Sequence, residues 1–359
     1  MKILHLIHTN QRRGAEIFAV QLSEIQQRYG HEVKIVSVYT GNDSLKTISK
    51  IETLSGSFNS RFYDIKAWYR LSRIIKKFDP DVIQANAGDT LKYAIFSKFF
   101  FFWKVPIVFR NASEIGRYLN SNLQKNYNSF LFKRTDYIIS VSNASKKDII
   151  SRFPYLKERT VVIPIGLQNN TSIKKVYFEP KEAFHIIHVG GFTFEKNHEA
   201  LIEIFEGLHR NNPNTYLHLI GDGPLRSSIE TMVGNARLEK FVNFHGFIDN
   251  PLNYVSGANV LVLPSKIEGL PGVILEAMFC KTPVVAYNVG GISEIVNSKT
   301  GFLVSKDDVE EFKNAIVKVL EAFPKQKVSV AYDMVTSNFM NENIAKKFLQ
   351  SYDTIIGKT

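Results

Sequence analysis

The sequence predicts an α/β protein built from two doubly wound, parallel-sheet halves. The chain has 359 residues, more than a single hydrophobic core usually serves. Short apolar runs alternate with segments whose apolar residues recur at helical spacing, the pattern of a parallel sheet covered on both faces. The alternation stops at a polar stretch near residue 168 and then starts again, which indicates two domains of similar construction.

Six apolar runs in the first half are expected to form strands. Between them, apolar side chains in residues 15–25 and 71–78 follow helical spacing. Asn143 or Ser142 can cap a further helix that begins near Ala144. The expected strands are residues 3–7, 33–38, 81–85, 105–109, 137–141 and 161–163.

The polar segment 167–182 lacks periodicity and is interpreted as the interdomain linker. Residues 1–168 then form an N-terminal Rossmann-like domain and residues 183–337 a C-terminal one. Residues 338–359 form a last segment whose helix, 338–356, can pack back on the N-terminal domain, although its apolar pattern fits either half. The strands of the second half are expected at 185–189, 216–220, 242–244, 260–263, 284–286 and 302–304.

Composition limits the kinds of binding partner and the cellular location that we expect. With 45 basic and 34 acidic residues, the formal charge is +11 and the sequence pI is near 9.4, which suits a polyanionic partner or an anionic membrane surface. Residues 1–8 are typical of a first strand rather than a signal peptide, and the apolar stretch 94–103 is about half the length of a membrane span. We expect a cytoplasmic protein, soluble or peripheral on the cytoplasmic face of the membrane. The single cysteine, Cys280, excludes an intrachain disulfide and is expected to be a small buried core residue.

Glu268 and Glu276 bracket a segment that runs from the apolar strand 260–263 into a predicted helix. Pro271 and Gly272 suit the first turn of that helix, where unpaired N–H groups and the helix dipole favour an anion such as a diphosphate. Glu268, ahead of the helix, can accept hydrogen bonds from sugar hydroxyls. Glu276, about a turn inside it, can accept a pair from a ribose diol. The segment therefore predicts a sugar-nucleotide site.

Glycine turns follow two other strands of the second half. Gly190 and Gly191 precede Lys196 and a helix; the glycines would let a phosphate approach the backbone, and the lysine could neutralise it. A tight turn beside a solvated lysine is an equally good interpretation of this motif taken alone. The turn Gly221-Asp222-Gly223-Pro224 is more typical of a structural element than of a direct ligand.

In the first half, Gly14 is predicted to start a helix after the first strand. It would permit close approach by a donor phosphate or an acceptor, and Arg12 and Arg13 could meet an anionic acceptor. Two arginines in a loop are, however, more often simply solvated charges. Asp79 and Asp81 have a metal-binding spacing but precede a strand at the end away from the presumed site, so we reject them as a metal site.

The sequence lacks three motifs that are typical of other enzyme classes. The nine histidines form no helical pair with a matching carboxylate of the zinc-hydrolase kind. No Gly-x-Ser-x-Gly elbow and no phosphate loop ending in Gly-Lys-Ser/Thr occurs. These absences weaken hydrolase and kinase interpretations.

Together these motifs resemble those of the family-four retaining glycosyltransferases of the GT-B fold, a group that includes bacterial cell-surface polysaccharide transferases. The resemblance covers nearly the whole chain and is densest from Gly190 to Val304. Several motifs in the same order are far more specific than any one of them. They are Gly190–His198, Gly221–Pro224, His245–Phe247, Leu263–Ser265, Glu268–Glu276, Pro283–Ala286 and Gly290–Glu294, with Arg13–Glu16 resembling the family's amino-terminal loop.

The resemblance implies two Rossmann-like domains facing an interdomain cleft and the metal-independent transfer of a sugar from a nucleoside diphosphate sugar, UDP-sugars first, with retained anomeric configuration. It implies that Lys196 and Glu268 are catalytic, with Lys196 on the diphosphate and Glu268 on the transferred sugar. Glu276 would bind the ribose. The other donor-binding residues it implies are Gly14, Gly190, Gly191, Gly246, Phe247, Gly269, Leu270, Pro271 and Gly272, with Gly246 and Phe247 beside the nucleobase.

Three positions depart from the family pattern. Gly191 stands where many members carry arginine, so diphosphate charge would rest more heavily on Lys196. The run 110–114, Arg-Asn-Ala-Ser-Glu, replaces a loop that often bears a histidine, and Ile165 replaces a frequent asparagine. The catalytic contacts of the N-terminal half are therefore left unassigned.

The expected acceptor is a glycan or lipid-linked glycan in cell-surface polysaccharide biosynthesis, such as capsule, lipopolysaccharide or O-antigen. A membrane-attached acceptor fits the positive charge and the aromatic stretch 96–104, which fits a buried helix ending on a surface lysine equally well. The alternatives are a sugar-nucleotide epimerase of the same fold and a non-catalytic basic binding protein. We expect no nucleic-acid partner, because the chain has no recognised nucleic-acid module.

Overall fold

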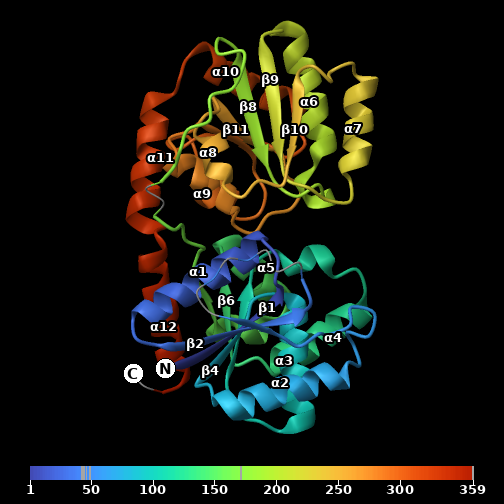
Figure 1. Ribbon diagram of the computed structural model, residues 1–359, viewed down its shortest axis with the longest axis vertical. Coiled ribbons are helices and arrows are strands. Elements are labelled where there is room, and N and C mark those ends of the chain that lie inside the picture. Colours follow the sequence, from blue (N-terminus) through green and yellow to red (C-terminus); the bar gives the residue numbers. More distant parts are fainter. Residues whose placement is uncertain (42–44, 46, 48–49, 170–171, 358–359) are drawn as a thin grey trace. The chain divides into compact units, whose positions relative to one another are not determined.

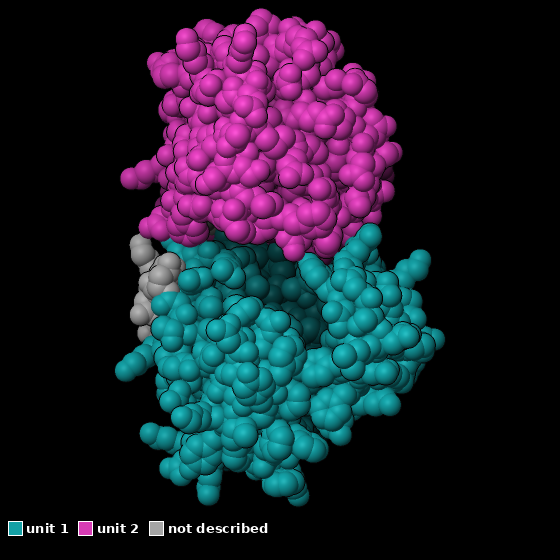
Figure 2. Space-filling view, turned by 90° about the vertical axis from the view of Figure 1, so that its right-hand side faces the viewer, with its two compact units in different colours: residues 1–168, 341–359 teal, residues 169–340 magenta. Residues whose placement is uncertain are grey.

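The computed structural model describes residues 1–41, 45, 47, 50–169 and 172–357. The chain divides into two compact units, coloured separately in Figure 2. Unit 1 comprises residues 1–168 and 341–359, and unit 2 comprises residues 169–340. The chain therefore leaves unit 1 once and returns to it for its last helix.

Unit 1 is built on a seven-stranded sheet with the order β3-β2-β1-β4-β5-β6-β7, and all its pairings are parallel. Successive strands run outward from β1 to β3 on one side and from β4 to β7 on the other, as in doubly wound folds. Loops that bind ligands are therefore expected at the carboxyl ends of the strands. The strands are β1 (Lys2–Thr9), β2 (Glu32–Tyr39), β3 (Ile51–Thr53), β4 (Val82–Ala85), β5 (Ile107–Asn111), β6 (Tyr137–Ser140) and β7 (Thr160–Val162).

Helices cover both faces of this sheet (Figure 1). One core cluster joins the sheet to α2, α3 and α4, and another joins it to α1 and α12. The helices are α1 (Gly14–Arg28), α2 (Ile65–Phe78), α3 (Gly88–Phe101), α4 (Asn122–Lys133), α5 (Asn143–Arg152) and α12 (Asn341–Ile355), with 3-10 turns η1 (Ile115–Tyr118) and η2 (Pro154–Arg159). Ser142 is the residue that caps α5, through its side chain and the Ser145 amide.

Unit 2 repeats this plan with a six-stranded parallel sheet in the order β10-β9-β8-β11-β12-β13. Its strands are β8 (Phe184–Val189), β9 (Thr215–Ile220), β10 (Val242–Gly246), β11 (Val260–Leu263), β12 (Val284–Tyr287) and β13 (Phe302–Val304). Its helices are α6 (His198–Asn211), α7 (Arg226–Asn235), α8 (Pro251–Val255), α9 (Gly272–Phe279), α10 (Val309–Glu321) and α11 (Lys325–Asn338), with 3-10 turns η3 (Phe194–Lys196) and η4 (Ile292–Glu294). The predicted α/β class with two parallel sheets is confirmed.

Four expectations about elements need correction. The helix predicted over 338–356 is interrupted, because Phe339 closes α11 on Val335 and Asn341 starts α12 by donating its amide to Leu167. The predicted strand 105–109 lies at 107–111, because its pairing with β6 extends to Asn111. The short strand β3 and the helix α11 were not predicted.

Three further side chains differ from, or clarify, the sequence interpretation. Cys280 is half-buried rather than fully buried, and burial raises the pKa of its thiol to about 12. Asp81 accepts a hydrogen bond from the Lys2 amide at 2.7 Å, and Asp79 ends α2 in the left-handed region. Both aspartates therefore organise the junction between α2 and the start of β1.

The last helix belongs to unit 1. On α12, Ile344, Phe348 and Tyr352 are buried in the same core cluster as Phe18 of α1. The Tyr352 hydroxyl donates to the side-chain oxygen of Gln84 on β4. Within the described residues, no helix is both long and apolar enough to cross a bilayer.

Candidate functional site

Glu268 lies in the loop between β11 and α9, where a strand of four buried residues ends and a helix begins. Its carboxylate is largely buried, and one oxygen accepts two hydrogen bonds, from Ser265 Oγ at 2.8 Å and Lys196 Nζ at 2.7 Å. The residue ahead of α9 is Pro271, so no side chain caps the helix and its first amides are left for a ligand or solvent. The loop thus combines a positioned carboxylate with an uncapped helix start.

Lys196 reaches Glu268 from a different part of the unit 2 sheet. It ends η3, the short turn that follows β8 and the glycines at 190 and 191. A Cβ on Gly190 would lie 3.2 Å from Lys196 Cδ, so this glycine leaves room for the lysine side chain to pass. The sequence predicted each residue as part of the donor site, but it did not predict that they form an ion pair with each other.

The glycine turns after β8, β9 and β10 lie side by side at one end of the sheet. The Gly190 amide donates to Ile220 O at 2.9 Å, and the Gly221 amide donates to Gly246 O at 2.8 Å. Gly221 has a φ of +136°, and a Cβ there would lie 2.1 Å from Gly190 O. Gly221 is therefore a packing residue for the first turn, as the sequence predicted, while Phe247 is exposed beside it.

A second glycine pair holds the Glu268 loop in place. Gly290 follows β12 with a φ of +55°, and a Cβ there would lie 1.9 Å from Glu268 O. The Gly291 amide donates to Gly269 O at 2.7 Å. Sequence reasoning placed these glycines only within a family motif and assigned them no role; the available signal was a Gly-Gly pair directly after a predicted strand. Ser265 was missed in the same way.

Glu276 projects from the middle of α9 and is partly exposed. Its carboxylate makes no hydrogen bond or ion pair with any described residue, and burial raises the pKa of this group to about 7. An unpaired carboxylate that loses solvation is costly to the folded protein. A ligand that donates two hydrogen bonds to it would offset this cost.

Two neighbouring histidines, His188 and His198, lie close to the turn at Gly190. His198 stacks on Phe192 with ring centroids 4.0 Å apart, and burial lowers the pKa of its imidazole to about 4. Burial also holds the pKa of His188 well below its usual value. Both rings stay neutral near pH 7, so Lys196 supplies the positive side-chain charge at this turn.

In unit 1, Gly14 is the first residue of α1, as predicted. Its N-cap residue, Arg13, makes no side-chain capping bond, and a Cβ on Gly14 would meet nothing within 4 Å. Glu16 lies in the first turn of α1 and is buried, and burial raises the pKa of its carboxyl group. The helix start is therefore open, with a carboxyl group close behind it.

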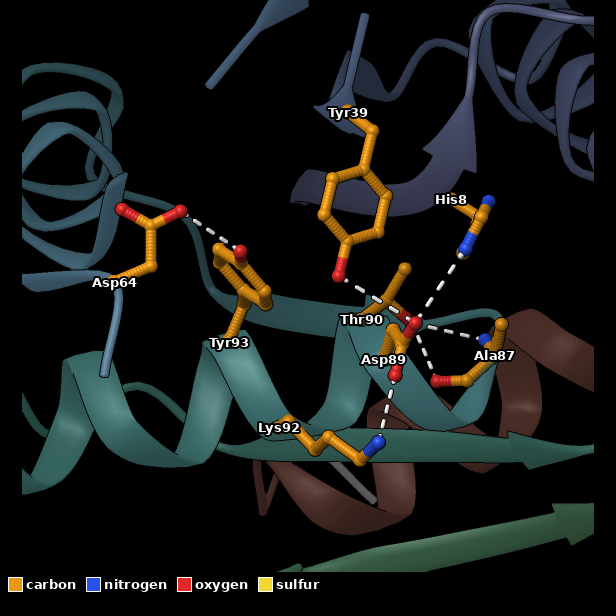
Figure 3. A network of polar contacts seen from close by, with 8 residues as sticks. All are labelled: His8, Tyr39, Asp64, Ala87, Asp89, Thr90, Lys92 and Tyr93. Atoms are coloured by element: carbon orange, nitrogen blue, oxygen red, sulfur yellow. Dashed lines mark hydrogen bonds and ion pairs between the residues drawn. The ribbon is translucent and has the colours of Figure 1, made fainter. Parts of the chain in front are cut away.

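A polar network lies near the same end of the unit 1 sheet and centres on Asp89 (Figure 3). Lys92 Nζ lies 2.7 Å from one carboxylate oxygen, and His8 Nε2 lies 3.5 Å from the other, which also accepts from Tyr39 Oη at 3.4 Å. These hydrogen bonds and charges hold the pKa of Asp89 below its usual value, although burial acts in the opposite direction. Asp89 is thus ionised and satisfied by its neighbours. Sequence reasoning did not identify it.

Unit 1 also contains a cavity of about 840 Å³ at the carboxyl ends of β4 and β5. Its wall is largely apolar, it has Arg61 and Lys92 among its lining residues, and none of these residues is acidic. The principal apolar residues that line it are Phe62, Leu91, Phe109, Ile115, Leu119, Leu123, Tyr127, Leu131 and Phe132.

The run that replaces the family's histidine-bearing loop begins inside β5. Arg110 is 3% exposed and lies over the Phe18 ring at 4.5 Å, and its Nε and Nη1 atoms donate to no acceptor in the described part of the chain. Asn111 donates to Ser140 Oγ at 3.2 Å and Ser145 O at 3.3 Å. The first two positions of this run are therefore strand residues, not loop residues as the sequence suggested.

Comparisons with known proteins match both units. Glycosyltransferase Family 4 matches residues 12–168, and Glycosyl transferases group 1 matches residues 169–331. An uncharacterised glycosyltransferase from Methanocaldococcus jannaschii is 25% identical over 249 residues, which cover 63% of this chain and 60% of that protein. A lipopolysaccharide core biosynthesis glycosyltransferase from Rhizobium meliloti, LpsD, is 24% identical over the full length of both chains.

The fold is shared with a solved structure. The crystal structure of Anabaena Alr3699/HepE in complex with UDP and glucose superposes with a TM-score of 0.83 and 20% identity, covering 99% of this chain and all of that one. Two parallel-sheet α/β units of this kind constitute the GT-B fold. The chain belongs to the glycosyltransferases, with a family 4 domain followed by a group 1 domain on a GT-B fold.

Proposed function

We propose that this glycosyltransferase moves a sugar from a UDP-sugar to a glycan or lipid-linked glycan acceptor, with retention of anomeric configuration and without a metal ion. The observation that carries the proposal is the Lys196–Glu268 pair beside the uncapped start of α9. Two names from the comparisons support it: Alr3699/HepE was crystallised with UDP and glucose, and the Rhizobium relative is named for lipopolysaccharide core biosynthesis.

In this proposal the donor lies across the turns of unit 2. The diphosphate occupies the start of α9 and contacts Lys196, because amide groups and a cation converge there. Glu276 accepts both ribose hydroxyls, which would explain why its carboxyl group has no partner in the protein. Gly246 and the exposed Phe247 lie beside the nucleobase, and the amides of residues 269–272 complete the site.

The chemical difficulty is charge separation. As the bond between the anomeric carbon and the phosphate oxygen breaks, the sugar becomes oxocarbenium-like and the diphosphate gains negative charge. Lys196 and the α9 dipole stabilise that charge in a preorganised way. Glu268, held by Ser265, binds the sugar hydroxyls and favours the positive sugar. The acceptor oxygen then bonds to the anomeric carbon from the face the phosphate leaves, and its proton goes to a phosphate oxygen.

We assign the acceptor to unit 1. The 840 Å³ cavity offers apolar walls and three cations, Arg61, Lys92 and Arg110, which suits an acceptor that carries both apolar and anionic groups. Gly14 opens the start of α1 to such a molecule. A role in cell-surface polysaccharide biosynthesis, as in capsule, lipopolysaccharide or O-antigen assembly, is consistent with these features.

The test begins with binding. A donor at one hundred times its dissociation constant stabilises the folded state by about 2.7 kcal/mol, so a thermal-shift panel of UDP, GDP and ADP sugars identifies the nucleotide. Product analysis with and without a saccharide acceptor then reveals the reaction, and the anomeric signal in the NMR spectrum reports retention. A changed nucleotide sugar released without acceptor would instead identify an epimerase, and no shift with any nucleotide sugar would overturn the proposal.

A further inference from the structure

Charge is distributed very unevenly over the helices. The three helices on one face of the unit 1 sheet, α2, α3 and α4, contain a single acid, Asp89, and many cations. These cations are Lys66, Arg70, Arg73, Lys76, Lys77, Lys92, Lys98, Lys125 and Lys133. In unit 2, by contrast, α6 and α10 carry more acids than cations. These three helices, whose outward surface is called the α2–α4 face, therefore carry much of the net positive charge of the chain.

The outward side of α2 mixes these cations with apolar side chains. The buried residues of α2 recur on one side of the helix, from Ala67 to Phe78. Ile65, Tyr69 and Arg73 lie opposite them and are exposed, as are Lys66, Lys76 and Lys77. A helix with cations and exposed apolar side chains on its outward surface is typical of binding at a bilayer interface.

Aromatic rings continue this surface across α3 to α4. At the end of α3, Phe99 and Phe100 are about half exposed and Phe102 is 83% exposed. Tyr69 of α2 contacts Phe101 at 5.5 Å between ring centroids, and Phe99 contacts Phe130 of α4 at 6.3 Å. The guanidinium of Arg134 lies 3.8 Å from the Phe130 ring centroid. These contacts connect the rings and cations of the three helices, which Figure 1 shows as neighbouring ribbons.

We propose that the α2–α4 face docks on a membrane surface rich in anionic lipids. A bilayer interface satisfies both components, because lipid phosphates attract lysine and arginine and the interfacial region accepts aromatic rings. A nucleic-acid backbone would pair with the cations but not with the aromatic rings. A second copy of this face would be repelled, because both copies are positively charged. Docking would keep a lipid-linked acceptor and the enzyme at the same surface.

The contribution of the cations to membrane binding is tested with the full-length protein and sedimenting vesicles. The vesicles consist of phosphatidylcholine alone or of phosphatidylcholine mixed with phosphatidylglycerol. Wild type is expected to bind the mixed vesicles and to release them as salt is raised. Each cation near an anionic surface strengthens binding about fivefold. The triple variant Arg73→Gln/Lys76→Gln/Lys77→Gln should therefore bind the mixed vesicles about a hundredfold more weakly.

A matched control separates a specific face from net charge. Lys240→Gln/Lys318→Gln/Lys325→Gln removes three exposed cations from unit 2, so it lowers the formal charge by the same amount. It should retain wild-type vesicle affinity. Equal losses in the two triple variants, or no vesicle binding by wild type, would overturn the proposal. So would tighter binding to duplex DNA than to vesicles with the same dependence on the α2 cations.

The contribution of the aromatic rings to membrane binding is tested by the double variant Phe99→Ser/Phe102→Asn. Asparagine is chosen at position 102 because it tolerates the left-handed backbone there. This variant should bind mixed vesicles several-fold more weakly at high salt, where ring insertion contributes a larger share. Unchanged binding would remove the aromatic component from the proposal. Transfer to a water-soluble acceptor should be unaffected in all three variants, so a failed docking test is distinguishable from a failed donor assignment.

Discussion

Two carboxylates, one in each unit, lie near the carboxyl ends of parallel strands and have opposite environments. Asp89 in unit 1 has Lys92, His8 and Tyr39 around it, and its pKa lies below the usual value. Glu276 in unit 2 has no described partner, and its pKa is raised to about 7. Both are partly desolvated, so the presence or absence of partners decides the direction of the shift.

Of these two carboxylates, only Asp89 has its partners within the described part of the protein. Asp89 gains its hydrogen bonds on folding, so its network organises β1, β2 and α3 around one another. The carboxylate of Glu276 loses solvation on folding and gains no hydrogen bond or ion pair with a described residue. This environment is expected of a group that binds a ligand. Glu268 is intermediate, because its buried carboxylate has a lysine partner that a diphosphate can also bind.

The largest expected effect concerns this shared lysine. Lys196→Ala removes the cation that stabilises the leaving diphosphate, and Glu268→Ala removes the group that holds the sugar. Each should lower kcat by about a hundredfold or more in a radiolabelled sugar-transfer assay. Lys240→Gln, an exposed unit 2 lysine outside the site, is the control and should match wild type. Parent-rate transfer by purified Glu268→Ala would show that its assigned role is wrong.

Glu276→Gln should weaken donor binding and stabilise the free protein. Loss of the charge-assisted hydrogen bonds to the ribose should lower the donor affinity about tenfold or more, as measured by calorimetry. Because the folded-state pKa is raised, wild-type stability should fall as pH rises from about 4.5 to about 7. Above pH 7 the ligand-free variant should therefore be more stable than wild type by about 1–3 kcal/mol. A variant that is no more stable would remove the contrast with Asp89.

Asp89→Asn should change stability rather than donor binding. Loss of the ionised acceptor should cost about 1 kcal/mol at pH 7, measured by urea denaturation, with unchanged UDP-sugar affinity. The folded-state pKa of Asp89 is lowered, so its contribution is fully present above the usual aspartate pKa and is lost progressively as pH falls from that value to the lowered folded-state pKa. The difference between variant and wild type should therefore shrink in acid. Loss of transfer without loss of stability would mean that Asp89 acts on a substrate.

The smallest expected effect is that of a chelator. If Lys196 and the start of α9 carry the charge of the leaving group, transfer rates should be equal with EDTA and with added Mg²⁺. A rate that depends on Mg²⁺ would assign part of that charge to a metal. The Lys196→Ala rate, measured in the same two buffers, distinguishes the two sources.

Much of the donor site was predictable because it is local in sequence. The runs 260–263 and 272–279 are apolar with strand and helix character, so Glu268 and Glu276 fall before and within a helix whatever the rest of the chain does. The glycine turns after β8 and β9 follow from the same local rules. The extent of β5 and the break before α12 did not follow, because pairing with β6 and the contact of Asn341 with Leu167 decide them.

The sequence by itself determined the two α/β halves and the chemical character of the turns, since periodicity and glycine placement are properties of neighbouring residues. Only the tertiary structure decided which turns meet. β8 lies between β9 and β11, and this order brings Lys196 to Glu268 across 72 positions of sequence. The α2–α4 face has the same origin, because its cations and rings come from three helices that a shared core holds together. Side chains distant in sequence become partners only after burial of apolar surface has fixed the strand order.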